Sequence, residues 1–158
     1  MKIIAGIARG ISLSAPDGYE VRPTSARARK ALFDSIGVFS GKIVFDLFAG
    51  SGALGLEAAS RGAASVVFID NTQSSCDHIK ENILKVQRTG VQCQFTLIHG
   101  DVLSDEVYKQ FSGKKPDLIF ADPPYKRSSS FFSVLAESET FLSLASDAIL
   151  IWEFPHEQ

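Results

Sequence analysis

Short apolar runs alternate along most of the chain with segments in which apolar residues recur every three or four positions. Five runs have the length and composition of buried strands: residues 43–48, 66–69, 95–98, 118–121 and 149–152. The segments between them show helical spacing, as at Cys76, Ile79 and Ile83, and glycines such as Gly90 end them. Strands that alternate with helices predict a parallel sheet with right-handed crossovers, so we expect a doubly wound α/β fold.

The N-terminal residues and the last helical segment show patterns of their own. Residues 3–14 contain two short alternating runs and predict a β-hairpin. A helical pattern follows, with Thr24 or Ser25 as its N-cap and Gly37 as its C-terminal stop. The last helical segment, residues 128–145, is expected to break near Glu139.

Length and composition favour one domain over residues 1–158, in which residues 1–40 form a basic hairpin-and-helix extension and residues 41–158 the catalytic core. No apolar run reaches the roughly 18 residues of a membrane span. The start of the chain also lacks a secretory signal pattern, so a cytoplasmic protein that binds no membrane is expected. Cys76 and Cys93 have no metal-ligand spacing, which predicts buried free thiols and no metal site.

Charge is distributed unevenly along the chain. Residues 1–30 contain six basic and two acidic side chains, a net charge of +4, so the remainder of the chain carries −6. A basic arm on an acidic body suggests that the arm meets a polyanion while the body binds a different ligand. A solvated charged face is the alternative explanation.

A glycine-rich segment follows the first strand of the predicted sheet. Residues 50–55 read G-S-G-A-L-G and lead into a helix, and Asp70 ends the second strand 18 residues after Gly52. Glycines at such a turn let the backbone approach a ligand closely, and an acid at the second strand can accept hydrogen bonds from ribose hydroxyls. The pattern therefore predicts a nucleotide-type ligand.

The acids at the strand ends narrow the choice of ligand. A nicotinamide cofactor brings a pyrophosphate, which Asp46, just before the glycine loop, would repel. S-adenosylmethionine has an ammonium group, a ribose and an adenine, and no phosphate. Asp46, Asp70 and Asp101 end three successive strands and suit the amino-acid end, the ribose and the adenine amine, respectively. We therefore predict S-adenosylmethionine as the cofactor.

The segment Asp122-Pro123-Pro124-Tyr125 follows the fourth strand. Prolines cannot continue a sheet ladder, so the pair predicts a rigid corner at the strand edge where open α/β sheets bind ligands. The corner presents the Asp122 carboxylate, proline carbonyls and the Tyr125 ring, and so predicts a ligand site.

These motifs together resemble the Rossmann-like class I methyltransferases that modify exocyclic amines of nucleobases. The segments I-I-A-G-I-A-R-G-I-S-L and R-P-T-S-A-R-A-R-K-A-L-F-D-S-I further resemble the ribosomal RNA small subunit methyltransferase D family, which makes N2-methylguanine in 16S ribosomal RNA. The resemblance covers nearly the whole chain. It implies a monomeric enzyme that acts on the small ribosomal subunit.

The resemblance and the charge pattern together indicate three groups of site residues. The expected cofactor-binding residues are Asp46, Ala49, Gly50, Gly52, Asp70, Asn71, Asp101, Val102 and Thr24. The expected catalytic residues are Asp122, Pro123, Pro124 and Tyr125: Asp122 and a proline carbonyl would accept the two hydrogens of the amine, and Tyr125 would stack on the base. Apart from the resemblance, Phe131 and Phe132 are further candidates for substrate contact. The expected RNA-binding residues are Arg9, Arg22, Arg27, Lys30, Lys126 and Arg127.

Two features depart from the family pattern. The first hairpin carries fewer basic and aromatic residues than is usual, which leaves Arg9 with few basic neighbours for RNA. The family also closes its sheet with an antiparallel hairpin after the fifth strand, and we expect this hairpin to be absent because the sequence ends at Gln158.

Other functions fit parts of the pattern. The proline corner would equally orient adenine N6 or cytosine N4 in a DNA amino methyltransferase. The glycine pattern by itself fits an NAD-dependent oxidoreductase. The absent C-terminal hairpin suggests, as a third class, an RNA-binding protein without catalysis.

Overall fold

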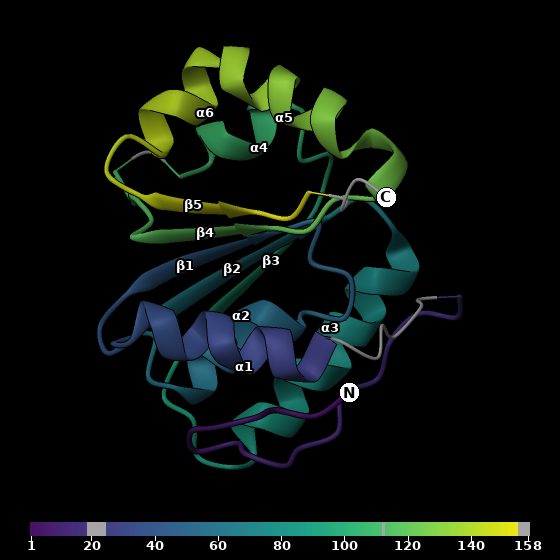
Figure 1. Ribbon diagram of the computed structural model, residues 1–158, viewed down its shortest axis with the longest axis vertical. Coiled ribbons are helices and arrows are strands. Elements are labelled where there is room, and N and C mark those ends of the chain that lie inside the picture. The colour runs from purple at the N-terminus through teal and green to yellow at the C-terminus, as the bar shows by residue number, and fades with distance from the viewer. Residues whose placement is uncertain (19–24, 112, 155–158) are drawn as a thin grey trace.

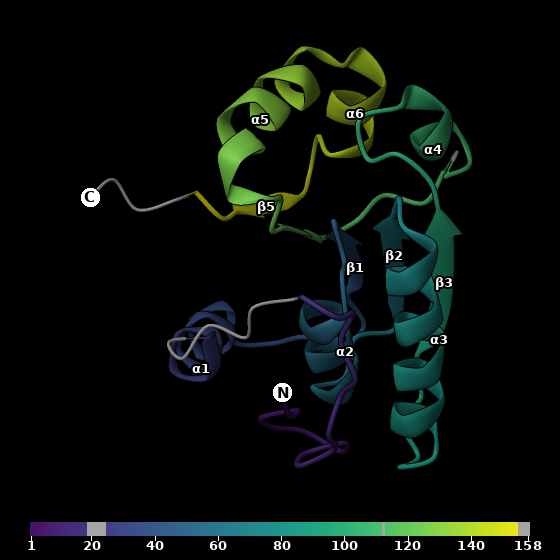
Figure 2. The same ribbon diagram turned by 90° about the vertical axis from the view of Figure 1, so that its right-hand side faces the viewer.

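A computed structural model of the protein describes residues 1–18, 25–111 and 113–154. A five-stranded sheet in the order β3-β2-β1-β4-β5 lies between two layers of helices, with α1, α2 and α3 on one face and α4, α5 and α6 on the other (Figures 1 and 2). All neighbouring strands pair in parallel. The predicted doubly wound α/β fold is confirmed.

The helices and strands follow the predicted order closely. In chain order they are α1 (Ser25–Ile36), β1 (Ile43–Leu47), α2 (Ala53–Ser60), β2 (Ser65–Asp70), α3 (Gln73–Gln87), β3 (Gln94–His99), α4 (Asp105–Lys109), β4 (Leu118–Ala121), the 3-10 turn η1 (Tyr125–Arg127), α5 (Ser128–Glu137), α6 (Glu139–Leu144) and β5 (Ile149–Trp152).

Burial explains why the central strands read as continuous apolar runs. Every residue of β2 and β4 is buried, whereas the outer strands β3 and β5 are partly exposed. Alternate residues of a strand point to opposite faces, so Val44 joins the core under α1, α2 and α3 while Phe45 joins the core under α4, α5 and α6. A parallel sheet covered on both faces requires this composition.

The helix boundaries match most of the signals in the sequence. Gly37 has φ 82° and donates its N–H to Phe33 O at 3.2 Å, which ends α1 as expected. The break in the last helix falls at Ser138, whose hydroxyl accepts from Phe141 N and caps α6. The predicted N-cap Thr24 lies outside the described residues. None of the helices described is long and apolar enough to cross a bilayer.

The predicted N-terminal hairpin is present only as an isolated antiparallel bridge between Lys2 and Ser12. Ile3 N donates to Ile11 O at 3.0 Å, but the ladder does not extend into regular strands. Leu13 N also donates to Met1 O at 2.8 Å, so the two runs pair as a short antiparallel hairpin, while N–H groups of residues 4–8 between them bind α2.

Two side chains of α2 receive this N-terminal segment. The fully buried Glu57 carboxylate accepts from Ile4 N at 2.8 Å and from Ala5 N at 3.0 Å. Ser60 Oγ accepts from Ala8 N at 2.9 Å and donates to Ala5 O at 2.6 Å. Because these polar groups satisfy one another, the segment packs onto the domain without a sheet of its own.

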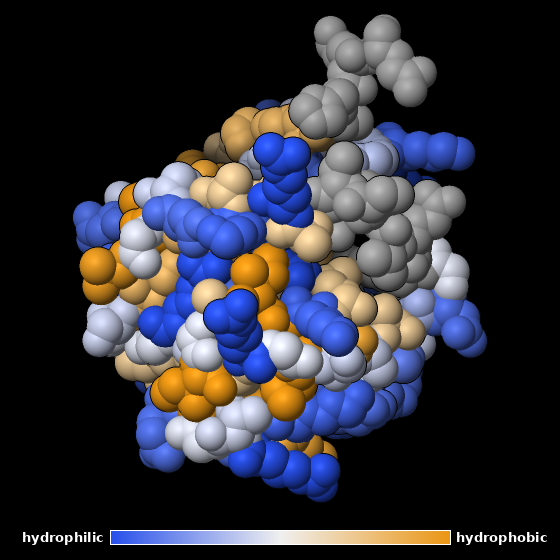
Figure 3. Space-filling model, turned by 60° about the horizontal axis from the view of Figure 1, so that its bottom comes forward, coloured by the Kyte–Doolittle hydropathy of each residue, from blue (hydrophilic) through white to orange (hydrophobic). Residues whose placement is uncertain are grey.

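The outer face of this layer shows no large apolar patch. Figure 3 views the molecule from the side of the N-terminal segment and shows hydrophobic side chains in small groups among hydrophilic ones. Exposed apolar residues of this layer and its loops include Ile7, Val38 and Leu84. Isolated exposed apolar residues are normal for a protein surface.

The docking of the N-terminal segment predicts unequal effects for two alanine substitutions. Gly6 and Gly10 have φ 82° and 87°, so alanine at either position strains the backbone by roughly 1 kcal/mol. A Cβ on Gly6 would lie 1.9 Å from Ser60 O, whereas a Cβ on Gly10 meets nothing within 4 Å. We expect Gly6→Ala to lower the free energy of unfolding by about 1–3 kcal/mol more than Gly10→Ala. Urea denaturation measures both, and equal losses would contradict the packing described.

Candidate active site

Two strand-end carboxylates hold the glycine loop. Gly50 N donates to Asp70 Oδ2 at 2.9 Å, and Gly55 N donates to Asp46 Oδ2 at 2.9 Å. Gly52 is the N-cap of α2 in the left-handed region, with φ 77°, and has no side chain to cap the helix. Asp46 therefore satisfies one of the N–H groups that a helix leaves unpaired in its first turn.

Asp46 is buried to 2% exposure. Burial raises the pKa of its carboxyl group well above the usual value, the N–H of Gly55 acts in the opposite direction, and the negative charges of Asp122 and Asp70 raise the pKa further. A cation placed beside these three carboxylates would favour the ionised form of Asp46. The arrangement is suited to bind a positively charged group.

Asp70 also fixes the start of α3. Its Oδ1 accepts from Thr72 N and Thr72 Oγ1, both at 3.0 Å, and Thr72 in turn caps α3 by accepting from Ser75 N. One carboxylate thus connects the glycine loop, β2 and α3. Each carboxylate oxygen has two lone pairs, so the group retains acceptor capacity for a ligand hydroxyl.

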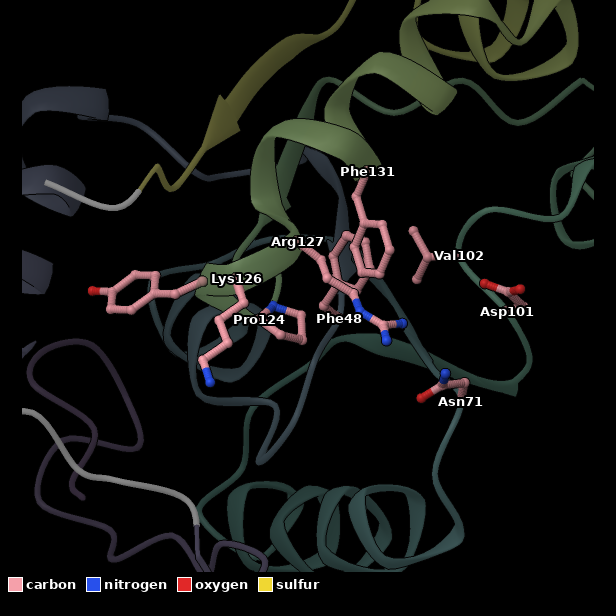
Figure 4. Close-up of a pocket in the computed structure, with 9 residues that line it drawn as sticks. Phe48, Asn71, Asp101, Val102, Pro124, Lys126, Arg127 and Phe131 are labelled. Carbon is pink, nitrogen blue, oxygen red and sulfur yellow. The ribbon is translucent and has the colours of Figure 1, made fainter. Parts of the chain in front are cut away.

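A cavity of about 460 Å³ opens beside these acids at the carboxyl edge of the sheet (Figure 4). Its lining comes from residues that are distant in sequence: Phe48, Asn71, Asp101, Val102, Pro124, Tyr125, Lys126, Arg127 and Phe131. The structure thus brings predicted cofactor-binding, catalytic and RNA-binding residues into one cavity. Asp46 and Asp70 are buried and do not form part of its lining.

The wall of the cavity contains a stacked aromatic pair. The rings of Phe48 and Phe131 lie 5.6 Å apart with an interplanar angle of 4°, and Arg127 extends past them toward the side of Asn71 (Figure 4). Phe131 was a candidate from sequence, whereas Phe132 packs against Trp152 instead.

Phe48 was missed by the sequence analysis. Its φ of 57° makes it the only non-glycine residue with a positive φ in the described parts of the chain. Bulky residues adopt this conformation rarely, and such strain often occurs at functional sites. One sequence signal could have indicated Phe48. It is a large aromatic residue between a buried strand and a glycine turn, and the turn itself requires only small residues.

The predicted corner follows β4 directly. Asp122 is half-buried, and Pro124 has an extended backbone before the chain turns into η1. The Tyr125 ring is 38% exposed, and its hydroxyl donates to Glu153 Oε1 at 3.3 Å. Glu153 is a second residue of this edge that the sequence analysis did not identify.

The loop after β3 supplies the remaining predicted cofactor residues. Asp101 Oδ1 accepts from Leu103 N at 2.9 Å, and the buried Tyr108 hydroxyl donates to Val102 O at 2.5 Å. Burial raises the pKa of Tyr108, so the hydroxyl remains a donor. These bonds hold the loop in place at the rim of the cavity.

A single amide connects the N-terminal segment with the glycine loop. The fully buried Asn82 side chain accepts from Ser14 N at 2.9 Å and donates to Ser14 O at 2.8 Å and Ser51 O at 2.9 Å. The imidazole Nδ1 of His78 lies 3.1 Å from Ser14 Oγ. The middle of the basic arm, at Ser14, is therefore fixed relative to the glycine loop.

The predicted RNA-binding residues fall in separate places. Lys126 and Arg127 line the cavity, and exposed Arg27 and Lys30 lie on α1, where Lys30 pairs with Asp34. Arg9 lies next to Ala8, which binds the C-terminal end of α2, roughly one helix length of 12 Å from the glycine loop. Arg22 lies outside the described residues.

The described residues contain no group of three or more His, Cys, Asp and Glu side chains that could hold a metal ion. Both cysteines are free, with Cys76 buried and Cys93 half-buried. Burial raises the pKa of Cys76 and raises that of Cys93 to about 11, so neither thiol is activated as a nucleophile.

Comparison with known proteins places this geometry in a family. Residues 1–158 match the family described as Conserved hypothetical protein 95. The chain belongs to this family. The ribosomal RNA small subunit methyltransferase D of Escherichia coli (strain K12) is 33% identical over 128 residues, which are 80% of this chain and 61% of that protein. The predicted relationship to the ribosomal RNA small subunit methyltransferase D family is confirmed.

Two further proteins support the assignment. YlbH of Bacillus subtilis (strain 168), named as a candidate rRNA methyltransferase, is 32% identical over 158 residues, 99% of this chain and 84% of that protein. The structure of yhhF from Escherichia coli, titled as a candidate methyltransferase, has a TM-score of 0.69 and 31% identity over 96% of this chain and 75% of that one. The chain thus spans less than two thirds of the E. coli small subunit methyltransferase D and a larger share of these two relatives.

The raised pKa of Asp46 predicts a pH-dependent effect of Asp46→Asn on stability. Because the folded protein binds this proton more tightly than the unfolded chain, the contribution of Asp46 to stability is fully present below about pH 4 and is lost as pH rises toward the raised pKa. An asparagine oxygen can still accept from Gly55 N without carrying a charge. We expect Asp46→Asn to match the wild type in free energy of unfolding at pH 3.5 and to equal or exceed it at pH 8.

The same variant separates stability from ligand binding. Calorimetry with S-adenosylhomocysteine, whose amino-acid end carries an ammonium group, should show at least about tenfold weaker binding to Asp46→Asn, because a buried charge partner is lost. Undiminished affinity would contradict a role for Asp46 in binding the cation.

Proposed function

We propose that this protein is an S-adenosylmethionine-dependent methyltransferase that acts on the N2 amine of a guanine in 16S ribosomal RNA. The choice of cofactor is based mainly on the hydrogen bonds of the glycine loop. The N–H groups of Gly50 and Gly55, which a pyrophosphate would need, already donate to Asp70 and Asp46. The negative charges at this loop favour a cationic ligand over NAD.

The described residues fit the cofactor on chemical grounds. Asp46 would attract the ammonium group, Asp70 would accept from ribose hydroxyls, and Asn71, Asp101 and Val102 would surround the adenine end in the cavity. When bound, S-adenosylmethionine supplies the methyl group: its methyl C–S bond breaks as the N–C bond forms, S-adenosylhomocysteine is released, and the surplus amine proton passes to water or Asp122.

The residues after β4 would position the acceptor. Asp122 and a carbonyl of the Pro123-Pro124 corner would accept the two amine hydrogens and aim the nitrogen lone pair at the methyl group. Orientation of this kind can lower a barrier by about 7 to 11 kcal/mol in favourable cases. A base stacked on the partly exposed Tyr125 ring would gain roughly 1 to 3 kcal/mol, which offsets part of its extrusion from RNA.

The proposed RNA substrate is supported by the names of two relatives and by basic residues near the cavity. Ribosomal RNA small subunit methyltransferase D of E. coli and YlbH of B. subtilis are both named for action on rRNA. The exposed Lys126 and Arg127 at the cavity, with Arg27 and Lys30 on α1, would bind the RNA backbone. A DNA amino methyltransferase that acts on adenine N6 or cytosine N4 is the second candidate, because the same corner could orient those amines.

A methyl-transfer assay distinguishes these candidates. Unmethylated 30S subunits, naked 16S RNA and DNA are offered separately with labelled S-adenosylmethionine, and we expect label only in RNA, as N2-methylguanine. Labelling of DNA alone would refute the proposed substrate. Calorimetry against NAD and S-adenosylhomocysteine tests the cofactor, and micromolar binding of NAD with no response to S-adenosylhomocysteine would refute it.

Substitution of the corner carboxylate should separate catalysis from cofactor binding. We expect Asp122→Ala to lower kcat at least about 100-fold, because the amine loses one orienting acceptor, while affinity for S-adenosylhomocysteine stays within about threefold. The exposed Asp147→Ala is the matched control and should leave both quantities unchanged. Wild-type turnover of Asp122→Ala would show that another group orients the amine.

A further inference from the structure

The carboxamide of Asn82 on α3 is fully buried and uses all of its hydrogen-bonding capacity on two distant segments. Its Oδ1 accepts from Ser14 N at 2.9 Å and from Ser14 Oγ at 3.2 Å. Its Nδ2 donates one hydrogen to Ser14 O at 2.8 Å and the other to Ser51 O at 2.9 Å. An amide has two hydrogens and two lone pairs, so any rotation of this group breaks bonds to both segments.

The bond to Ser51 fixes the glycine loop from outside the sheet. Asp70 holds the N–H of Gly50 from β2. The next carbonyl along the loop, that of the buried Ser51, is held by Asn82 from α3. Asn82 thus orients the peptide that joins Ser51 to Gly52, the N-cap of α2. A change in this orientation would tilt the backbone that the cofactor has to approach closely.

The bonds to Ser14 fix the end of the N-terminal segment. Further upstream, residues 4–8 bind buried side chains of α2, so two helices hold the segment. Lys2 and Arg9 lie on this segment and are exposed. A polyanion bound to these two side chains would favour the docked position of the segment, because a ligand stabilises the state to which it binds more tightly.

We propose that Asn82 is a positioning residue that couples RNA binding by the N-terminal segment to cofactor binding at the glycine loop. This inference rests on the proposed function. RNA on the segment holds Ser14 against α3, and the fixed amide then keeps the Ser51 carbonyl in one orientation. The ligand that binds first bears the entropy cost of ordering both segments, so the second ligand binds more tightly.

Such coupling is reciprocal, which makes it measurable from either ligand. In the wild type we expect saturating S-adenosylhomocysteine to tighten RNA binding about 5- to 10-fold, and RNA to tighten S-adenosylhomocysteine binding by the same factor. Unmethylated 30S subunits and naked 16S RNA serve as RNA probes in turn. Their dissociation constants are measured with and without S-adenosylhomocysteine.

Two substitutions break the connection at different points. Asn82→Asp keeps the shape of the side chain and removes the amide hydrogens that hold Ser14 O and Ser51 O. Ser14→Pro leaves the buried amide in place and removes the N–H that donates to it, so it serves even if the first variant does not fold. We expect each to reduce the coupling factor to within about twofold of one.

Kinetics give a second measurement of the same role. Asn82→Asp should raise KM for S-adenosylmethionine about 10-fold, the effect of roughly one lost hydrogen bond. At saturating cofactor and RNA, kcat should stay within about threefold of the wild type, because the groups that contact the reacting atoms are unchanged.

Leu144→Ala is the control for a purely structural role. Leu144 on α6 is buried in the core on the opposite face of the sheet from α2 and α3. Its truncation leaves a cavity and should lower the urea midpoint, yet the coupling factor should remain that of the wild type. A general loss of stability would instead affect the coupling in this variant as well.

The outcomes separate this inference from the function on which it rests. A wild type that binds both ligands with a coupling factor near one would overturn the role of Asn82 alone, as would a folded Asn82→Asp or Ser14→Pro that keeps the wild-type factor. A wild type that fails to bind S-adenosylhomocysteine or RNA would overturn the proposed function, and this inference with it.

Discussion

The N–H groups of the glycine loop donate to carboxylates from the two neighbouring strands, and the rest of the site is arranged around these bonds. A helix N-terminus normally attracts an anion from solution, because its first N–H groups are unpaired and its dipole is positive. Here Asp46 provides that anion from within the chain. Carboxylates of the chain therefore already occupy N–H groups of the loop. As a result, the loop favours a positively charged ligand, where a bare helix N-terminus would favour an anion.

The same bonds explain how buried acids are tolerated. An isolated buried carboxylate is strongly disfavoured unless hydrogen bonds compensate for the lost water. Within the described part of the chain, Asp70 accepts three such bonds, from Gly50 and from the backbone and side chain of Thr72, whereas Asp46 accepts one, from Gly55. Burial is the largest cause of the raised pKa of Asp46. A cation beside Asp46 would therefore offset part of the cost of burying its charge.

The sequence predicted those parts of the fold that local patterns determine. Strand runs, helical spacing and stops such as Gly37 depend on nearby residues, and parallel strands bring Asp46, Asp70 and Asp101 to one edge by topology alone. The attachment of the N-terminal segment to α2 was not predicted, because its hydrogen-bond partners there lie 52 and 53 residues away, where no local pattern reveals them.

Two residues of the site, Phe48 and Glu153, could not be identified from the sequence because their positions depend on the three-dimensional structure. Phe48 enters the cavity only through an unusual backbone conformation, which no residue preference indicates for phenylalanine. Glu153 follows the last strand, and its nearness to Asp122 depends on the pairing register of β4 with β5. The pairing register depends on how side chains pack across the whole sheet. The end of β5 could therefore be recognised from sequence, but the residue of β4 that lies beside it could not.

The attachment of the N-terminal segment also bears on the order in which the chain acquires its structure during synthesis. Residues 4–8 bind Glu57 and Ser60, and Ser14 binds Asn82 at a separation of 68 residues. This segment leaves the ribosome before α2 and α3, and therefore has no binding site until they have been made. At about 5–20 residues per second, Asn82 is added about 3 to 14 s after Ser14. Residues 4–14 thus reach their native contacts only after a later part of the chain has been translated.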